Sequence, residues 1–244
     1  MIDVRALTTR EEFESAVELQ KQIWHFDDVE LLPVRLFVVA SKIGGQLFGA
    51  FDGERLVGFS IGIPGIKPGS KPYIHSHMLG VVPGYRDRGV GRMIKLRQRE
   101  DALARGIDLI EWTFDPLELK NAYFNIERVG AVVRRYILNQ YGITTSRLHS
   151  GLPTDRCVAE WYVANPRVEE RLNGVHTVAA PAEARVEVPL DIAEMRQADP
   201  RRARAVQERV SEQFVECFAR GLTVTDFEAG STSASYLFSR WESR

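Results

Sequence analysis

Apolar residues in the first part of the chain recur at helical and at strand spacings in turn. Between Phe13 and Trp24 they stand three and four positions apart, which predicts an amphipathic helix. Thr9 and Glu12 have the spacing of a capping box, in which each side chain bonds the backbone N–H of the other residue. A second helix is predicted to begin at Pro33 and to end before the Gly-Gly pair that follows it.

Strand spacing dominates the next segment. Apolar runs over 47–51 and 56–63 flank Asp52-Gly53, a dipeptide that strongly signals a two-residue hairpin turn. Further on, Asp115 followed by Pro116 predicts the start of a helix that Gly130 ends. The other elements predicted up to residue 165 are strands over 4–7, 73–82, 107–114, 131–138 and 156–163, and a helix that runs to about Ala104.

The composition changes after Asn165. Residues 173–185 are rich in alanine and read as a connector, and a long helix is predicted over about 193–219, with Pro200 starting or breaking it. We therefore expect a domain over 1–165 and a smaller C-terminal α+β extension over 166–244. The strands predicted for the extension cover 186–189, 222–227 and 233–239.

Charge and cysteine content exclude several classes of protein. The formal net charge is −1, whereas a nucleic-acid-binding protein needs a basic face to displace counterions. The two cysteines, Cys157 and Cys217, form neither a disulfide framework nor a zinc motif, and no metal site is expected. The charged N-terminus does not read as a signal peptide, and no apolar run approaches the roughly 20 residues that span a bilayer. A cytoplasmic protein without a membrane partner is the expectation.

The most specific motif is the segment Leu79-Gly-Val-Val-Pro-Gly-Tyr-Arg-Asp-Arg-Gly-Val-Gly91. It reads as a strand end, a bend and the glycine-rich start of a helix, whose unpaired N–H groups attract phosphate. A dinucleotide-binding loop needs a third glycine, and a P-loop needs Gly-Lys-Ser/Thr. The alternatives that remain are an ordinary turn and the pattern Arg-x-x-Gly-x-Gly, which runs from Arg86 through Gly89 to Gly91.

With its upstream residues, this segment resembles the coenzyme A loop of the GNAT superfamily of N-acetyltransferases. The resemblance implies a mixed, centrally splayed sheet flanked by helices, and acetyl-CoA as cosubstrate. The strand backbone at Leu79 and Val81 would pair with the pantetheine arm. The pyrophosphate would bind the backbone N–H groups of Arg86, Asp87, Arg88, Gly89, Val90, Gly91 and Arg92.

An acetyl transfer to an amine also needs a base. His75 and His77 lie on one face of the predicted strand, in phase with Leu79 and Val81. Glu111 lies within the apolar run of the neighbouring strand, where a carboxylate is costly unless it is paired or functional. Each of the three is a candidate catalytic residue, and a structural role is the alternative for each.

For the acid that protonates the leaving thiolate, the sequence departs from the superfamily pattern. In the superfamily pattern a tyrosine lies four residues before the glycine that closes the following helix, and here that position is Ile126. Tyr123 is the nearest alternative acid, although its position also suits a core aromatic residue. Asn121 and Asn125 share a helix face. They are candidate contacts for the pantetheine amides or the thioester oxygen, and the alternative is a helix surface without a role in binding.

Further segments, among them Trp112-Thr-Phe-Asp-Pro116 and Gly151-Leu-Pro-Thr-Asp-Arg156, resemble a bacterial branch of the superfamily. The expected function is acyl transfer from acetyl-CoA to a small-molecule or peptide amine, and a homodimer is compatible with it. The alternatives are a non-catalytic CoA-binding sensor or scaffold and a nucleotide-binding fold. Four arginines are candidates for an acidic substrate or for solvated surface: Arg134, Arg135, Arg147 and Arg156.

Overall fold

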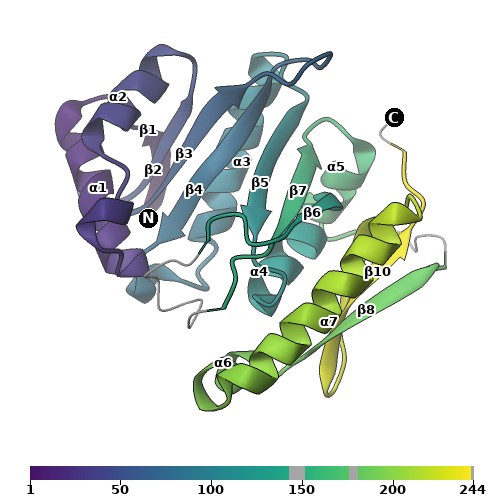
Figure 1. Ribbon diagram of the computed structural model, residues 1–244. Coiled ribbons are helices and arrows are strands. Elements are labelled where there is room, and N and C mark those ends of the chain that lie inside the picture. Colours follow the sequence, from purple (N-terminus) through teal and green to yellow (C-terminus); the bar gives the residue numbers. More distant parts are fainter. Residues whose placement is uncertain (143–151, 176–180, 243–244) are drawn as a thin grey trace. The chain divides into compact units, whose positions relative to one another are not determined.

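The computed structural model describes residues 1–142, 152–175 and 181–242 of the chain (Figure 1). These residues form two compact units, a first unit of Met1–Glu111 and a second unit that begins at Trp112. The division falls inside strand β5 (Leu109–Phe114), so this strand contributes residues to both units.

The first unit is an open sheet with helices on both faces. Its strand order is β1-β2-β3-β4-β5, and every pairing is antiparallel except that of β4 with β5. The elements are β1 (Ile2–Ala6), α1 (Arg10–Trp24), the 3₁₀ turn η1 (Asp28–Glu30), α2 (Val34–Lys42), β2 (Gln46–Asp52), β3 (Arg55–Gly65), β4 (Tyr73–Val81), the 3₁₀ turn η2 (Pro83–Tyr85) and α3 (Val90–Ala104).

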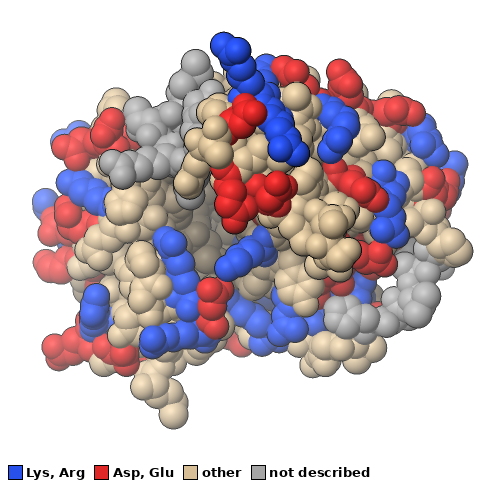
Figure 2. All heavy atoms as spheres, turned by 90° about the horizontal axis from the view of Figure 1, so that it is seen from below, with Lys and Arg blue, Asp and Glu red and all other residues tan. Residues whose placement is uncertain are grey.

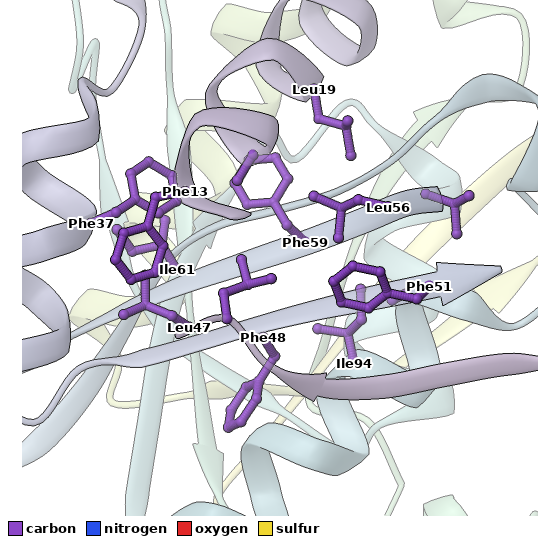
Figure 3. Close-up of a cluster of buried hydrophobic side chains, with 14 of the residues drawn as sticks. Phe13, Leu19, Phe37, Leu47, Phe48, Phe51, Leu56, Phe59, Ile61 and Ile94 are labelled. Carbon is purple, nitrogen blue, oxygen red and sulfur yellow. The ribbon is translucent and has the colours of Figure 1, made fainter. Parts of the chain in front are cut away.

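The core of the first unit lies on both sides of β2 and β3, because neighbouring strand residues point to opposite faces. The Phe59 ring packs 6.1 Å from that of Phe37 in α2 and 6.0 Å from that of Trp24 in α1. On the other face, Ile94 of α3 lies against Gly58. Figure 3 shows Phe59 and Phe48 projecting to opposite sides of the strands. The sheet is therefore covered by α1 and α2 on one face and by α3 on the other.

Strand β4 is irregular at its centre. Met78 pairs with Ile61, and the next pair is Ser76 with Gly62, so His77 is an extra residue that forms a β-bulge. On its other side β4 pairs with β5 in parallel through Ile74–Ile110 and His75–Glu111. The bulge and the parallel pairing meet within three residues of the same strand.

The second unit has the described strand order β7-β6-β9-β10-β8, with antiparallel pairings throughout. Phe214 of α7 is its central core residue and packs 5.0–5.3 Å from the rings of Tyr136, Tyr236 and Phe238. Its elements are α4 (Leu119–Tyr123), the π-helical turn η3 (Phe124–Arg128), β6 (Val132–Ile137), β7 (Arg156–Tyr162), α5 (Pro166–Leu172), β8 (Ala184–Pro189), α6 (Ile192–Ala198), α7 (Pro200–Ala219), β9 (Thr223–Ala229) and β10 (Ser233–Ser239).

The predicted mixed α/β class is confirmed, and most predicted elements are present within two residues of their expected ends. Pro200 divides the predicted long helix into α6 and α7, as its ring requires. Helix α5 was not predicted, although Asn165-Pro166 is a cap followed by proline at the first helical position. The predicted connector lies partly outside the described residues.

The prediction that a helix begins at Asp115-Pro116 is wrong. Helix α4 begins at Leu119, and the Asp115 carboxylate instead accepts a hydrogen bond from the Leu117 N–H at 2.8 Å. Asp115 also pairs with Arg196 at 2.7 Å, a partner 81 residues away that no local pattern announces.

Within residues 1–142, 152–175 and 181–242, no helix has both the length and the apolar character needed to cross a bilayer. Across this same part of the chain, no three histidine, cysteine or acidic side chains gather in a way that would hold a metal ion. Cys157 and Cys217 are both free and buried, and burial raises the pKa of the Cys157 thiol well above its ordinary value.

Candidate functional site

The predicted phosphate loop connects β4 to α3 through a strand–turn–helix arrangement. The chain leaves β4 at Val81, passes through η2, and enters α3 at Val90 with Gly89 as the N-cap residue. Gly89 has φ +79°, a left-handed conformation that glycine adopts without strain. Asp87 also has a positive φ, of 58°. No side chain caps this helix start among the described residues.

The space over the helix start is open. A β-carbon placed on Gly89 would meet no described atom within 4 Å, and one on Gly91 would meet only Leu79 Cδ2 at 3.6 Å. The first helical hydrogen bond runs from Met93 N to Gly89 O, so the N–H groups of Val90 and Gly91 precede the helical ladder. An uncapped, open helix N-terminus suits an anion.

Arg86 and Arg88 have different surroundings in this loop. The Arg86 N–H donates to Pro83 O, its Nε to Val81 O at 3.2 Å and its Nη2 to Ile23 O at 3.3 Å. These bonds tie the loop to the end of β4 and to α1. Arg88 is exposed, with its guanidinium 5.3 Å from the centre of the Tyr85 ring.

The surface seen from below Figure 1 carries charges of both signs. Figure 2 shows lysine and arginine side chains interspersed with aspartate and glutamate, without a broad region of one sign on this face.

A second group of polar residues lies where β4 pairs with β5. The parallel register places His75 beside Glu111, and the imidazole rings of His75 and His77 are 5.9 Å apart. Glu111 is buried, with 4 % of its surface exposed. Lys67, from the loop between β3 and β4, places its Nζ 2.5 and 2.6 Å from the two carboxylate oxygens of Glu111. The three predicted base candidates therefore lie together with a lysine that the sequence did not indicate.

Burial keeps both histidines of this group neutral at pH 7. Burial and, to a lesser extent, the neighbouring His77 lower the pKa of His75 to about 4, against the opposing effect of the Glu111 charge. Burial also lowers the pKa of His77. A neutral imidazole can accept a proton or a hydrogen bond, but a pKa near 4 makes His75 a weak base.

The opposite face of β4 carries another lysine that sequence reasoning missed. Lys95 of α3 is buried, and its Nζ lies 3.1 Å from Ser76 Oγ. Gln98 bonds the same hydroxyl. Burial lowers the pKa of Lys95 to about 7. Ser76 alternates with His75 along the strand, so the two polar groups belong to opposite faces of the sheet.

Leu79 lies on the α3 face with Ser76, because its Cδ2 is the atom nearest to a β-carbon on Gly91. The bulge at His77 thus reverses the alternation, and the prediction that the two histidines are in phase with Leu79 and Val81 is wrong.

The remaining predicted site residues lie in the second unit. Asn125 is buried, accepts a hydrogen bond from Trp112 Nε1 at 3.2 Å and donates one to Asn121 Oδ1 at 3.3 Å, which confirms that the two asparagines share a face. Ile126 is fully buried. Tyr123 is 42 % exposed, so it is not a core residue.

Two of the four candidate arginines pair with one acidic group of the second unit. Arg134 and Arg135 both pair with the buried carboxylate of Glu160. Arg156 is buried and donates to Asp155 O at 2.9 Å. Arg147 lies outside the described residues.

Comparison with solved structures identifies the fold. Neither the comparison with protein-family models nor that with curated proteins gives a match. The ribosomal-protein-S18-alanine N-acetyltransferase of Escherichia coli is similar over 68 % of this chain and 96 % of its own, at 13 % identity and a TM-score of 0.53. YncA of Salmonella typhimurium, solved with its cofactor acetyl-CoA, is similar over 68 % and 97 %, at 13 % identity and a TM-score of 0.54.

A eukaryotic structure gives the same result. NAA60 of Arabidopsis thaliana, solved in complex with a bisubstrate analogue, is similar over 66 % of this chain and 98 % of its own, at 15 % identity and a TM-score of 0.53. About two thirds of this chain thus matches the nearly complete length of each of these proteins. The chain has the fold of the GNAT acetyltransferases.

Proposed function

We propose that this chain is an acetyltransferase that moves an acetyl group from acetyl-CoA directly to an amine. The observation that supports this most is the open, uncapped start of α3, which follows directly from β4. The N–H groups between Asp87 and Arg92 would bind the pyrophosphate, with the partial positive charge of the helix N-terminus behind them. The solved relatives with acetyl-CoA or a bisubstrate analogue agree with this ligand.

The order of residues along β4 supports a direction for the bound cosubstrate. A pantetheine arm that leaves the loop and follows the strand would pass Val81 and then Leu79, both of which are partly buried at the strand surface. Its thioester end would then point toward the bulge at His77 and toward His75. The amine would meet the thioester near Glu111.

Glu111 would bind and deprotonate the acceptor amine, and the two histidines would lie beside it in neutral form. A carboxylate attracts an ammonium group, can accept its proton, and thereby yields the neutral amine that attacks the thioester carbon. His77 and His75 stay neutral at pH 7 because they are buried, so neither repels the incoming cation. Tyr123 remains our candidate for the acid that protonates the leaving thiolate.

A non-catalytic CoA-binding module is the second candidate. Its support is Ile126, an apolar and fully buried residue at the position where the superfamily pattern has its tyrosine. Both candidates bind acetyl-CoA, but only the acetyltransferase would transfer the acetyl group and release CoA.

Calorimetric titration with acetyl-CoA tests the shared part of both functions. Gly89→Asp puts a carboxylate where the pyrophosphate would lie, and a repulsion of about 3 kcal/mol would weaken binding roughly 100-fold. Gly106→Asp is the matched control, because Gly106 also has a positive φ (67°) and open space but follows the other end of α3. Equal affinity of the two variants would contradict the proposed loop, as would tighter binding of ATP or NAD than of acetyl-CoA.

Release of free CoA thiol with a panel of amines, amino acids and peptides tests the catalytic step. We expect turnover with at least one amine, and Glu111→Gln should reduce it while leaving acetyl-CoA affinity unchanged. Binding without turnover across the panel would favour the non-catalytic module.

A further inference from the structure

The Lys67–Glu111 pair places an amine of the protein itself against the group proposed to receive an acceptor. Lys67 Nζ contacts both oxygens of the Glu111 carboxylate, and the two residues are 44 positions apart in the chain. The Glu111 side chain is 5 % exposed, whereas that of Lys67 is 38 % exposed. One end of this pair is therefore fixed in a strand, and the other is a loop side chain that solvent reaches.

The surroundings of the Lys67 amine are those of an amine-binding site. Its Nζ lies 4.5 Å from the centre of the Tyr73 ring, a cation–π contact that holds an ammonium group. Its charge is also near enough to His75 to lower the pKa of that imidazole. A carboxylate, an aromatic face and a neutral imidazole therefore surround one primary amine.

The position of the Lys67 amine agrees with the direction proposed for acetyl-CoA along β4. His75, the strand partner of Glu111, is two residues from the bulge at His77, which corresponds to roughly 7 Å along a strand. The lysine side chain has four rotatable bonds, so a shift of this size lies within its reach.

It is informative that residue 67 is a lysine and not an arginine. The sequence has 32 lysines and arginines, of which six are lysines: Lys21, Lys42, Lys67, Lys71, Lys95 and Lys120. An arginine would satisfy a buried carboxylate with two parallel hydrogen bonds, but it cannot lose its proton in a protein. A lysine at this position provides an amine that can become a nucleophile.

We propose that Lys67 is a self-acetylation site, which takes the acetyl group from acetyl-CoA bound to the same chain. This inference rests on the proposed function and adds a protein amine to its substrates.

The reaction balances without a further reactant. The Lys67 ammonium gives one proton to Glu111, and the neutral amine attacks the thioester carbon. The new C–N bond forms, the C–S bond breaks, and the second proton of the amine accompanies the leaving thiolate to give CoA thiol. Glu111 then releases its proton to solvent. The product amide has no charge, so it no longer pairs with Glu111, and the carboxylate becomes available to an external amine.

Lys71 provides an internal control. It lies in the same loop and also pairs with a carboxylate, that of Asp108 at 2.9 Å, but both side chains are exposed, at 84 % and 58 %. Direct chemical acetylation by acetyl-CoA would modify Lys71 at least as fast as Lys67, because it depends on exposure. Enzymatic self-acetylation would favour Lys67.

Peptide mass spectrometry of the full-length protein incubated with acetyl-CoA tests the proposal. We expect acetylation of Lys67 at least 10-fold faster than that of Lys71, at a rate independent of protein concentration. Glu111→Gln should slow the modification of Lys67 and leave that of Lys71 unchanged, and Lys67→Arg should remove the signal from this position. Equal rates at the two lysines, or a rate that rises with protein concentration, would overturn the proposal.

The calorimetric titration separates this inference from the proposed function. A protein that binds acetyl-CoA and acetylates external amines, but not Lys67, would contradict the self-acetylation alone. A protein that does not bind acetyl-CoA would contradict both.

Discussion

At the residue scale, strand β4 separates two kinds of titratable group. Ser76 contacts the buried Lys95 on one face, while His75 and His77 belong to the other face. Burial lowers the pKa of Lys95 and of both histidines, so each favours its neutral form in the folded protein. At a pH where one of these groups is charged in the unfolded chain but neutral in the folded protein, the free energy of unfolding is therefore lower.

His75 is expected to make the protein sensitive to mild acid. Its pKa is about 4 in the folded state, whereas that of an unperturbed histidine is 6.5. Between these values the unfolded chain binds a proton that the folded protein does not, so the free energy of unfolding falls as the pH drops from 6.5 toward 4. In urea unfolding at pH 6.5 and 4.5, His75→Gln should reduce this loss by about 2 kcal/mol.

His25 supplies the control for this measurement, because its side chain is exposed and its left-handed conformation (φ 55°) suits asparagine. His25→Asn should keep the pH dependence of the wild type. A His75→Gln variant with the same pH dependence as the wild type would contradict the assigned pKa.

Gly80 has to be a glycine for packing reasons. A β-carbon at this position would lie 2.6 Å from Trp24 Cη2 and 2.9 Å from Ile23 Cδ1. We expect Gly80→Ala to lower the free energy of unfolding by about 1–3 kcal/mol, since α1 would have to move away from β4. Gly84→Ala is the control: no described atom lies within 4 Å of its β-carbon position, and its stability should stay within about 0.5 kcal/mol of the wild type.

At the element scale, the sequence predicted the structures that local interactions define. Thr9 and Glu12 form the expected capping box, and Gly53 turns the expected hairpin with φ +60°. Helix α3 ends at Ala104, with Gly106 in a left-handed conformation as predicted. These features depend on neighbours within a few residues, which a sequence displays directly.

The errors come from interactions over long distances in the chain. Asp115 resembled a helix cap, but its partner Arg196 lies 81 residues away. The segment 124–128 is a π-helical turn, whereas the sequence predicted a regular helix up to Gly130. Lys67 belongs to a loop without hydrophobic periodicity, and only the fold brings it to Glu111.

The same distinction holds for the candidate site. The strand, the bend and the glycine-rich helix start of the predicted phosphate loop were predicted from one continuous segment. The His75–Glu111 register needed the parallel pairing of two strands, which the sequence suggested only through the resemblance.

The capping box should contribute measurably to the stability of α1. Thr9 Oγ1 accepts from Glu12 N at 3.2 Å, and Glu12 Oε2 accepts from Thr9 N at 3.1 Å. Thr9→Ala leaves a helix N–H without its acceptor and should cost about 0.5–2 kcal/mol in chemical unfolding. The neighbouring exposed Thr8 is the control, and Thr8→Ala should change stability little. A similar loss in both variants would argue against the cap.

At the scale of the whole molecule, the boundary between the two compact units differs from the boundary that the change in composition suggests. The compact units separate between Glu111 and Trp112, whereas the change in composition placed a boundary at residue 165. Residues 112–142 and 152–165 share one unit with the C-terminal elements, joined by β6–β9 pairing and by the hydrogen bond from Phe227 N to Glu127 at 2.7 Å. The division into a domain over 1–165 and an extension over 166–244 stays a prediction.

A buried ion pair holds the extension within the second unit. Arg196 is 4 % exposed at its side chain and bonds both Asp115 and Glu118. Arg196→Met would leave the Asp115 carboxylate buried without this cation, and we expect a loss of about 3–5 kcal/mol in the free energy of unfolding. The surface pair of Arg204 with Glu208 offers the control, since Arg204→Met should cost less than about 0.5 kcal/mol. Equal losses of unfolding free energy in the two variants would show that the buried pair stabilises the second unit no more than the surface pair does.

Truncation tests whether 1–165 can fold without the extension. A chain that ends at residue 165 lacks Arg196 for Asp115, strand β9 beside β6, and Phe214, which packs on Tyr136. Because these losses expose the core of the second unit, we expect limited proteolysis to cut the truncated chain after residue 112 while the first unit resists. The near-ultraviolet circular dichroism of the buried Trp161 should weaken as well. A truncated chain that resists protease and unfolds in one cooperative step would instead support 1–165 as an autonomous domain, with the last helices and strands as a separable addition.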